Sequence, residues 1–380
     1  MRLESVDIGI LGAGQLARML AEAAIKNDFQ AGIFSKQEDD PARIKNVKIF
    51  SDLNELCQQS KTVIFESEFI DIAELRAFGT SNFFPTLNAI ESIQDKLAQK
   101  KMFKRLKIPS ANFLELEGSD REFGFDKAVF KMARQAYDGK GNFFFLKGEN
   151  EKNLEKFLQQ AKDRRIQVFV EECINFQQEV AITGCRLDQD FSFFPLVQSI
   201  QEKGVCKWVR GPAEKITPDL DVEEQAQEIF KKIAMDLGYE GVLSIEFFVD
   251  ENRRLLVNEL APRVHNSAHY SLLAASSSQF EVQVIAAAAR SLIRPVIQAP
   301  FFGMFNLLSP FVDGEFDYSP ENQSGVSDEF EIYWYGKKRL SLGRKMGHIS
   351  YQAQSKDALE RIEERIIKWE SDFWAKENRN

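Results

Sequence analysis

Two short apolar runs joined by a polar turn constrain the fold more than any other feature of this chain. The first run, 242–249, carries Glu246, and the second, 255–260, carries Glu259. If the runs pair as an antiparallel hairpin with a two-residue turn at 252–253, Glu246 lies directly opposite Glu259. The sequence therefore predicts a hairpin with two carboxylates on one face.

Carboxylates opposed on a sheet repel each other, by about 3 kcal/mol at ~5 Å with an effective dielectric of ~20. A divalent cation would compensate, and Mg²⁺ binds through one or two carboxylates together with substrate phosphates. Glu246 and Glu259 are therefore candidate metal ligands, and Asn258 could add an oxygen ligand or orient the pair. The competing interpretation is a surface hairpin with solvated glutamates, although the run around Glu246 is too apolar to lie wholly on a surface.

Composition excludes several classes of protein. The 380 residues allow two or three domains, and the chain has no apolar run of the roughly 18 residues that a membrane span needs. Acidic residues outnumber basic ones, 58 to 49, which argues against nucleic acid or an anionic membrane as the main partner. The four cysteines lack metal-site spacing, so free thiols in a reducing compartment are expected. Since no leader is recognisable, we expect a cytoplasmic protein.

The order of apolar runs predicts three units. A strand at 6–11, a glycine turn and a helix begin an alternation typical of a small parallel sheet with helices on both faces. A long helix over 89–106 then opens an α+β middle, and Pro295 precedes a small β-rich region closed by an amphipathic helix. We therefore expect a Rossmann-like domain over 1–88, a central domain over 89–294 and a C-terminal domain over 295–380.

The glycine turn at 12–17, Gly-Ala-Gly-Gln-Leu-Ala, is similar to the dinucleotide fingerprint. A NAD-binding unit needs an acid at the end of its second strand, where this chain has Phe34-Ser35-Lys36, so we do not expect NAD. The turn could still hold a phosphate or carboxylate of another ligand at the helix N-terminus, and packing alone is the alternative.

Three further segments are compatible with anion or nucleotide binding. Lys131 ends a strand, and the small and basic residues that follow it, up to Gly141, are typical of a phosphate flap. The segment 170–174, followed by Glu179, could read an adenine edge and ribose hydroxyls. The glycines and cations of 336–348 could hold a phosphate monoester. An ordinary surface turn or loop is the alternative for each.

Together these segments resemble the ATP-grasp superfamily and, within it, the 5-(carboxyamino)imidazole ribonucleotide synthases of purine biosynthesis. The resemblance spans nearly the whole chain and rests on 12–16, 137–141, 258–267 and 343–348. The run at 258–267, Asn-Glu-Leu-Ala-Pro-Arg-Val-His-Asn-Ser, is the most specific, because biotin carboxylases and other ligases of the superfamily share only the glutamate pair. The resemblance implies a central ATP-grasp domain that makes carboxyphosphate from ATP and bicarbonate and carboxylates 5-aminoimidazole ribonucleotide.

The resemblance also implies roles for residues of this chain. The metal ligands would be Glu246 and Glu259. The ATP site would comprise Lys96, Lys131, Glu171, Glu172, Cys173, Ile174, Glu179 and Asn258. The substrate would contact Gln15, Leu16, Glu68, Tyr137, Lys337, Arg344 and Lys345. The catalytic residues would be Arg263, His265, Asn266, Asp138 and Lys140.

The implied cofactors are ATP and two Mg²⁺ ions, without biotin, NAD or zinc. The implied partners are small molecules, and we expect a homodimer that passes its product to a separate mutase. Gln135 and Ala136 depart from the family pattern, which has glycines there, and 337–343 is one residue longer than usual. The alternatives are a formate-dependent purine enzyme of the same superfamily and a non-catalytic nucleotide sensor with the same fold.

Overall fold

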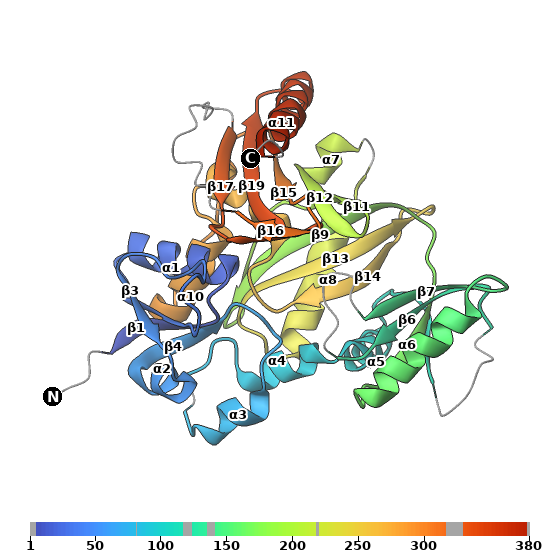
Figure 1. Cartoon of the computed structure of the whole chain (residues 1–380), viewed down its shortest axis with the longest axis horizontal. Helices are drawn as coiled ribbons and strands as arrows, with labels where there is room; N and C mark the ends of the chain where they lie inside the picture. Colours follow the sequence, from blue (N-terminus) through green and yellow to red (C-terminus); the bar gives the residue numbers. More distant parts are fainter. Residues whose placement is uncertain are drawn as a thin grey trace.

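The amino-terminal unit is a four-stranded parallel sheet. The computed structural model describes residues 5–80, 82–116, 124–134, 141–217, 220–316 and 330–377. The strand order is β3 (Val47–Phe50), β2 (Ala31–Phe34), β1 (Val6–Leu11) and β4 (Ser60–Phe65). Helices α1 (Gln15–Lys26) and α10 (Gln279–Ala289) pack on one face and α2 (Leu53–Gln59) on the other (Figure 1). The expected parallel sheet with helices on both faces is therefore confirmed.

The helix expected over 89–106 is instead two helices, α4 (Leu87–Gln94) and α5 (Lys96–Arg105). Asp95 separates them, because its carboxylate accepts the backbone N–H groups of Leu97 and Ala98, both at 3.0 Å. This is an N-cap, which satisfies amide groups that the first turn of a helix leaves unbonded. Lys96 consequently lies in the first turn of α5.

A smaller antiparallel sheet follows, in the order β5 (Phe113–Glu115), β8 (Val168–Glu172), β6 (Lys127–Met132) and β7 (Asn142–Leu146). Helix α6 (Glu151–Asp163) covers one face, where Leu154 and Phe157 are buried. Leu97 of α5 packs on the other face against Phe169. The sheet is thus held between two helices (Figure 1).

The larger sheet has nine strands and joins the centre of the chain to its C-terminal part. Its order is β14 (Leu255–Ala261), β13 (Gly241–Asp250), β9 (Phe176–Leu187), β11 (Val197–Glu202), β12 (Val205–Gly211), β15 (Phe301–Leu308), β19 (Lys345–Ala353) and β17 (Phe330–Trp334), and β10 (Asp190–Phe193) pairs with β9. Helix α8 (Glu223–Asp236) packs against β9 and β13 through Phe230 and Ile233. Because β12 pairs with β15, the sheet crosses the boundary expected at residue 295.

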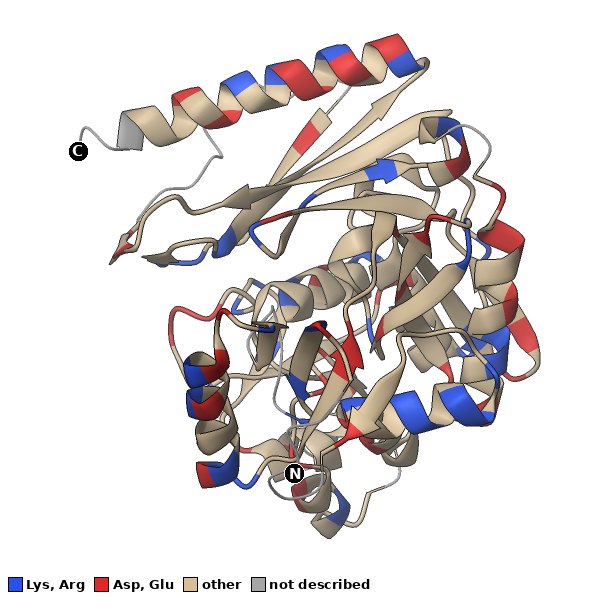
Figure 2. Cartoon of the chain, turned by 90° about the vertical axis from the view of Figure 1, so that its right-hand side faces the viewer, with Lys and Arg blue, Asp and Glu red and all other residues tan. Residues whose placement is uncertain are grey.

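The last helix, α11 (Lys356–Glu377), lies along β15 and β19 and buries Leu359, Ile362 and Ile366. Its charged residues are interspersed along its length (Figure 2). A two-stranded sheet of β16 (Asp313–Glu315) and β18 (Arg339–Ser341) lies beside this part, and the short helices α3 (Ile72–Ala77), α7 (Ala213–Ile216) and α9 (Ser271–Ala274) complete the described chain. None of the described helices is both long and apolar enough to cross a membrane.

Candidate active site between the two sheets

A cavity of about 710 Å³ lies where the amino-terminal unit meets the larger sheet. Its walls come from the start of α1, the segment after β4, the β13–β14 hairpin, the loop after β14 and the start of β19. The predicted site residues that line it are Gln15, Leu16, Glu68, Glu179, Glu246, Asn258, Glu259, Arg263, His265, Asn266 and Lys345. Residues up to 330 positions apart in the chain are thus gathered around one space.

A second cavity, of about 60 Å³, continues the first between α5, the smaller sheet and β14. It is lined by the predicted ATP-site residues Lys96, Lys131 and Glu171. Asn142, Asn258 and Glu259 belong to the walls of both cavities. A ligand that filled the smaller cavity would therefore reach the carboxylates of the larger one.

Glu246 lies opposite Glu259 in the β13–β14 hairpin, as the sequence predicts. The predicted two-residue turn is wrong, however: the turn has three residues, 251–253, and Arg253 adopts a left-handed conformation with φ of 59°. The extra turn residue would slip the register by one, but Asn258 forms a bulge that restores it, because Phe247 pairs with Val257 while Glu246 pairs with Glu259. The longer turn and the bulge compensate for each other, so the side chains of Glu246 and Glu259 lie on the same face of the hairpin.

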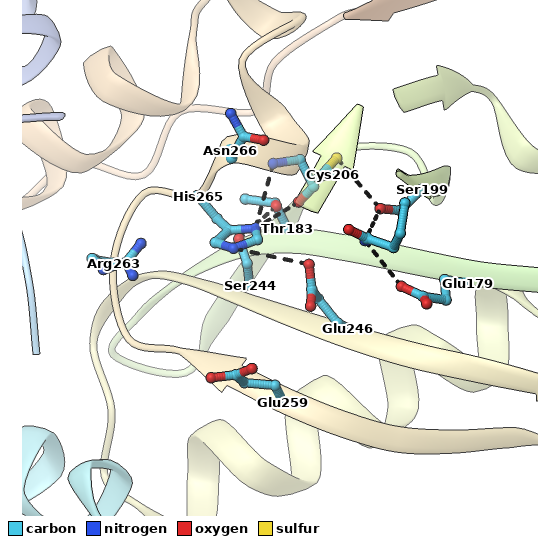
Figure 3. Close-up of polar contacts among 12 residues, drawn as sticks. Glu179, Thr183, Ser199, Cys206, Ser244, Glu246, Glu259, Arg263, His265 and Asn266 are labelled. Carbon is cyan, nitrogen blue, oxygen red and sulfur yellow. Dashed lines mark hydrogen bonds and ion pairs between the residues drawn. The ribbon is translucent and has the colours of Figure 1, made fainter. Parts of the chain in front are cut away.

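The charge of Glu259 and the burial of the site affect the ionisation of Glu246. Burial, together with the charges of Glu259 and Glu179, raises the pKa of Glu246 to about 7. His265 Nε2 lies 3.9 Å from Glu246 Oε1 (Figure 3). Burial and the neighbouring cations hold the pKa of His265 well below its ordinary value, so this imidazole is neutral. Its Nδ1 lies 2.9 Å from Ser267 Oγ and accepts the backbone N–H of Ser267 at 3.4 Å, while its Nε2 faces the carboxylate.

Arg263 is fixed by an acid from the amino-terminal unit. Its Nε donates to Glu68 Oε2 at 2.6 Å and one terminal nitrogen donates to Glu68 Oε1 at 3.3 Å. The other terminal nitrogen donates to the carbonyl of Val264. Both charged side chains are largely buried, so this bidentate pair connects two units of the fold at the edge of the larger cavity.

The anion at the glycine turn is the chain's own Glu66. Its carboxylate accepts the backbone N–H of Gly14 at 2.8 Å, and burial raises its pKa against the lowering effect of that bond and of bonds from Leu16 and Ala17. A Cβ at Gly12 or Gly14 would lie 2.2 or 2.3 Å from a Glu66 oxygen. The glycines therefore make room for a side chain, and the expectation that a ligand's phosphate or carboxylate fills this turn is not supported.

Several predicted residues lie outside the two cavities. Glu172 accepts a hydrogen bond from Asn112 at 2.7 Å, and Cys173 and Ile174 follow it at the end of β8. Lys337 Nζ donates to the carbonyl of Lys345 at 2.8 Å, and Arg344 donates to the carbonyl of Arg339 at 2.7 Å. Tyr137, Asp138 and Lys140 lie outside the residues that the structure describes.

Two buried amides that the sequence did not single out hold the loop after β14. Gln279 accepts the backbone N–H of His265 at 2.8 Å and donates to its carbonyl at 2.7 Å. Asn306 forms a reciprocal amide pair with Asn266, at 2.7 and 3.0 Å. Both amides are inaccessible to solvent. No spacing rule links them to the loop, because they come from α10 and β15.

Three family models match consecutive parts of the chain. The ribonucleotide synthetase preATP-grasp domain matches residues 5–94, the ATP-grasp domain matches 101–280, and the phosphoribosylaminoimidazole carboxylase C-terminal domain matches 303–362.

Relatives match over nearly the whole chain. An N5-carboxyaminoimidazole ribonucleotide synthase of Synechococcus elongatus is 34% identical over 375 residues, covering 94% of this chain and 92% of the relative. Another, of Synechocystis sp., is 30% identical and covers 92% of each chain. Among solved structures, the N5-carboxyaminoimidazole synthetase of Staphylococcus aureus complexed with ADP aligns with a TM-score of 0.81 at 27% identity, covering 96% of this chain and 98% of that one. The carboxyaminoimidazole ribonucleotide synthase of Aspergillus clavatus complexed with ATP aligns with a TM-score of 0.79 at 25% identity, covering 97% and 99%.

Proposed function

The chain belongs to the family of N5-carboxyaminoimidazole ribonucleotide synthases, and we propose that its two cavities are parts of one active site that binds both the nucleotide and the substrate. It is an ADP-forming ATP-grasp ligase that carboxylates 5-aminoimidazole ribonucleotide. The observation that carries the proposed site is that Asn142, Asn258 and Glu259 line both cavities. ATP bound at one end would meet the substrate at the carboxylate pair.

The proposed reaction has two steps, with bicarbonate as the source of the carboxyl group. A bicarbonate oxygen attacks the γ-phosphorus of ATP, the bond to the β-phosphate oxygen breaks, and ADP leaves. The exocyclic amine then attacks the carboxyl carbon of carboxyphosphate, phosphate leaves, and the amine loses a proton. Because water destroys carboxyphosphate, the protein has to exclude solvent and hold the amine close.

The nucleotide end consists of residues from both sheets and α5. Lys96 and Lys131 would hold phosphates, the backbone after Glu171 would contact adenine, and Glu179 would accept the ribose hydroxyls. Three contacts support this arrangement. Gln201 donates to Glu179 at 3.0 Å and orients it, and each lysine already faces a carboxylate, so it can exchange one anion for another.

A Mg²⁺ site fits the hairpin carboxylates. Glu246 and Glu259 are opposed oxygen donors, and burial together with the charge of Glu259 raises the pKa of Glu246, as expected where a cation normally offsets these effects. Among the described residues, no cluster of three or more His, Cys, Asp or Glu side chains could hold a metal, so the remaining ligands would be phosphate oxygens and water. When bound, Mg²⁺ would neutralise charge on the transferred phosphoryl group.

The substrate end lies between Arg263 and Lys345. Arg263, held by Glu68, would neutralise bicarbonate and the developing carboxyphosphate. The neutral His265 would donate its Nε2–H to a substrate oxygen, and Asn266, fixed by Asn306, would present its amide. Lys345, with Arg344 and Lys337 nearby in the chain, would hold the 5′-phosphate, while Gln15 and Glu68 would face the aminoimidazole.

The proposal extends to assembly. The three units expected from the sequence would together bind the nucleotide and the substrate within one protomer. Two protomers would form a homodimer. A separate mutase would consume the product. A carbamate is short-lived in water, which favours prompt consumption by such a partner.

Release of ADP tests the proposal. Purified protein with Mg-ATP should form ADP rapidly only when both bicarbonate and 5-aminoimidazole ribonucleotide are present. When formate replaces bicarbonate, the rate of ADP formation should fall to the background rate. A formate-dependent rate, or no dependence on the ribonucleotide, would contradict the proposed reaction, and ATP binding without any turnover would favour a sensor.

A further inference from the structure

Beneath the nucleotide cavity, one buried glutamate holds two buried lysines. Glu171 Oε2 lies 2.8 Å from Lys131 Nζ, and Glu171 Oε1 lies 3.0 Å from Lys100 Nζ. The side chains of Lys100, Glu171 and Lys131 are only 3%, 5% and 12% exposed. Lys131 is one of the predicted phosphate ligands, whereas the sequence analysis gave Lys100 no role.

Lys100 enters this cluster from α5. It lies one helical turn after Lys96, so both ammonium groups reach the same cavity, and Lys96 pairs with Glu259 at 3.0 Å. The cavity wall therefore contains three lysines, 96, 100 and 131, against two glutamates, 171 and 259, which leaves one excess positive charge. A buried excess of positive charge favours the binding of an anionic ligand.

We propose that Lys100 is a positioning residue that frees Lys131 for ATP. This inference rests on the proposed function, in which Lys131 binds a phosphate group. A phosphate group on Lys131 would compete with Glu171 for its ammonium group, and a buried carboxylate that loses its partners is strongly unfavourable. Lys100 stays on Glu171 and removes this obstacle. Without Lys100, Glu171 would retain Lys131 and compete with the phosphate.

A purely structural role explains Lys100 less well. Burial lowers the pKa of its ammonium group, and Glu171 offsets only part of this effect. An apolar side chain of similar length would fill the same space beside Phe103 without the desolvation cost. The presence of a lysine at position 100 is explained if its positive charge stabilises Glu171 while Lys131 binds phosphate.

The test measures ADP affinity by calorimetry and the KM values of ATP and ribonucleotide in four variants. Lys100→Met should weaken ADP binding and raise the ATP KM by about 10- to 150-fold, the effect of one charge-assisted hydrogen bond, with the ribonucleotide KM unchanged. Glu171→Gln changes a residue of the proposed ATP site and serves as the reference with which the double variant is compared. The double variant Lys100→Met/Glu171→Gln should recover to within about threefold of Glu171→Gln, because Lys131 then has no carboxylate to leave. Lys101→Met is the matched control: Lys101 is the next residue of α5, 53% exposed and paired with Glu115, and its loss should change none of these values.

A structural role predicts a different pattern. Lys100→Met would then lower the melting temperature and the turnover, and Glu171→Gln would not restore ATP affinity; this outcome, or a wild-type ATP KM in Lys100→Met, overturns the proposal. If Lys100→Met does not fold, the double variant and Lys100→Arg replace it, and weak ADP binding by either overturns the proposal. Since ADP binding is measured directly, failure of the carboxylation assay with wild-type protein would refute the proposed function alone.

Discussion

Glu246 and Glu259 face each other because Asn258 is an extra residue in β14. The turn of the hairpin shifts the register by one residue, and the bulge at Asn258 shifts it back. Without the bulge, Asn258 would lie opposite Glu246, and Glu259 would turn to the other face of the sheet. The bulge thus sets the relative position of the two candidate metal ligands and places the Asn258 amide beside them.

We predict that Glu246→Gln and Glu259→Gln each reduce ADP formation by at least about 100-fold, since each removes one metal-binding charge worth several kcal/mol in the transition state. Both variants should fold, because either substitution relieves repulsion. Glu251→Gln, in the exposed hairpin turn, is the control and should keep wild-type turnover. Steady-state kinetics at fixed Mg²⁺ decide the matter, and near-normal turnover in either variant would remove that residue from the metal site.

A second prediction concerns pH in the absence of Mg²⁺. The pKa of Glu246 is raised from 4.5 to about 7, so the folded state holds this proton more tightly than the unfolded state. Its stabilising contribution is complete below about pH 4.5 and is lost as pH rises through about 7. The free energy of unfolding of wild type should therefore fall relative to Glu246→Gln by about 1–3 kcal/mol between pH 5 and pH 8.5. Urea titrations at several pH values measure the difference, and parallel curves would show that the carboxyl group is not perturbed.

The third prediction distinguishes the cations near the C-terminal end of the site. Lys345→Met should raise the KM of the ribonucleotide by about 10- to 150-fold and leave the ATP KM unchanged, because Lys345 lines the substrate cavity. Arg344→Ala should have a smaller effect on the same constant, since its guanidinium donates to Arg339. Lys338→Met, at an exposed neighbouring position, serves as the control. A larger effect of Arg344 would place the phosphate outside the cavity described.

The fourth prediction tests the acid at the glycine turn. Gly14→Ala should destabilise the protein by about 1–3 kcal/mol, because the new Cβ overlaps Glu66. Combined with Glu66→Ala, the same substitution should cost much less, since the overlapping atoms are gone. A double-mutant cycle from urea unfolding gives the coupling directly. Additive losses would mean that the glycine is required for backbone reasons alone.

The amino-terminal sheet and the facing carboxylates follow from local sequence patterns, as does the membership of the ATP-grasp family. The alternation of apolar runs is strong at 6–65, and parallel pairing with helices on both faces satisfies it directly. The sequence predicted the correct pairing of Glu246 with Glu259, although it predicted a two-residue turn and the turn has three residues. Turn length and bulges depend on small differences in backbone energy that the apolar pattern of 242–260 does not encode.

Other features depend on contacts between distant parts of the chain. Glu66 could have been suspected as the partner of the glycine turn, because β4 and β1 are neighbours in such a sheet and both end at the same edge. Lys100 could have been found from its spacing of four residues after Lys96, which places both lysines on one face of a helix. Gln279 and Asn306 carry no comparable signal, since only the folded chain brings α10 and β15 to the loop after β14.

The nine-stranded sheet has a consequence for how the enzyme can move. The carboxylate hairpin and the strand that carries Lys345 belong to one continuous hydrogen-bonded ladder, so the distance between the metal-binding and phosphate-binding ends is set by the fixed spacing of strands, about 4.8 Å each. Among the described residues, the smaller sheet with Lys131 and Glu171 shares no ladder with it. The smaller sheet can therefore move relative to the larger one without breaking a strand pair, whereas a change in the distance between Glu246 and Lys345 would distort the larger sheet.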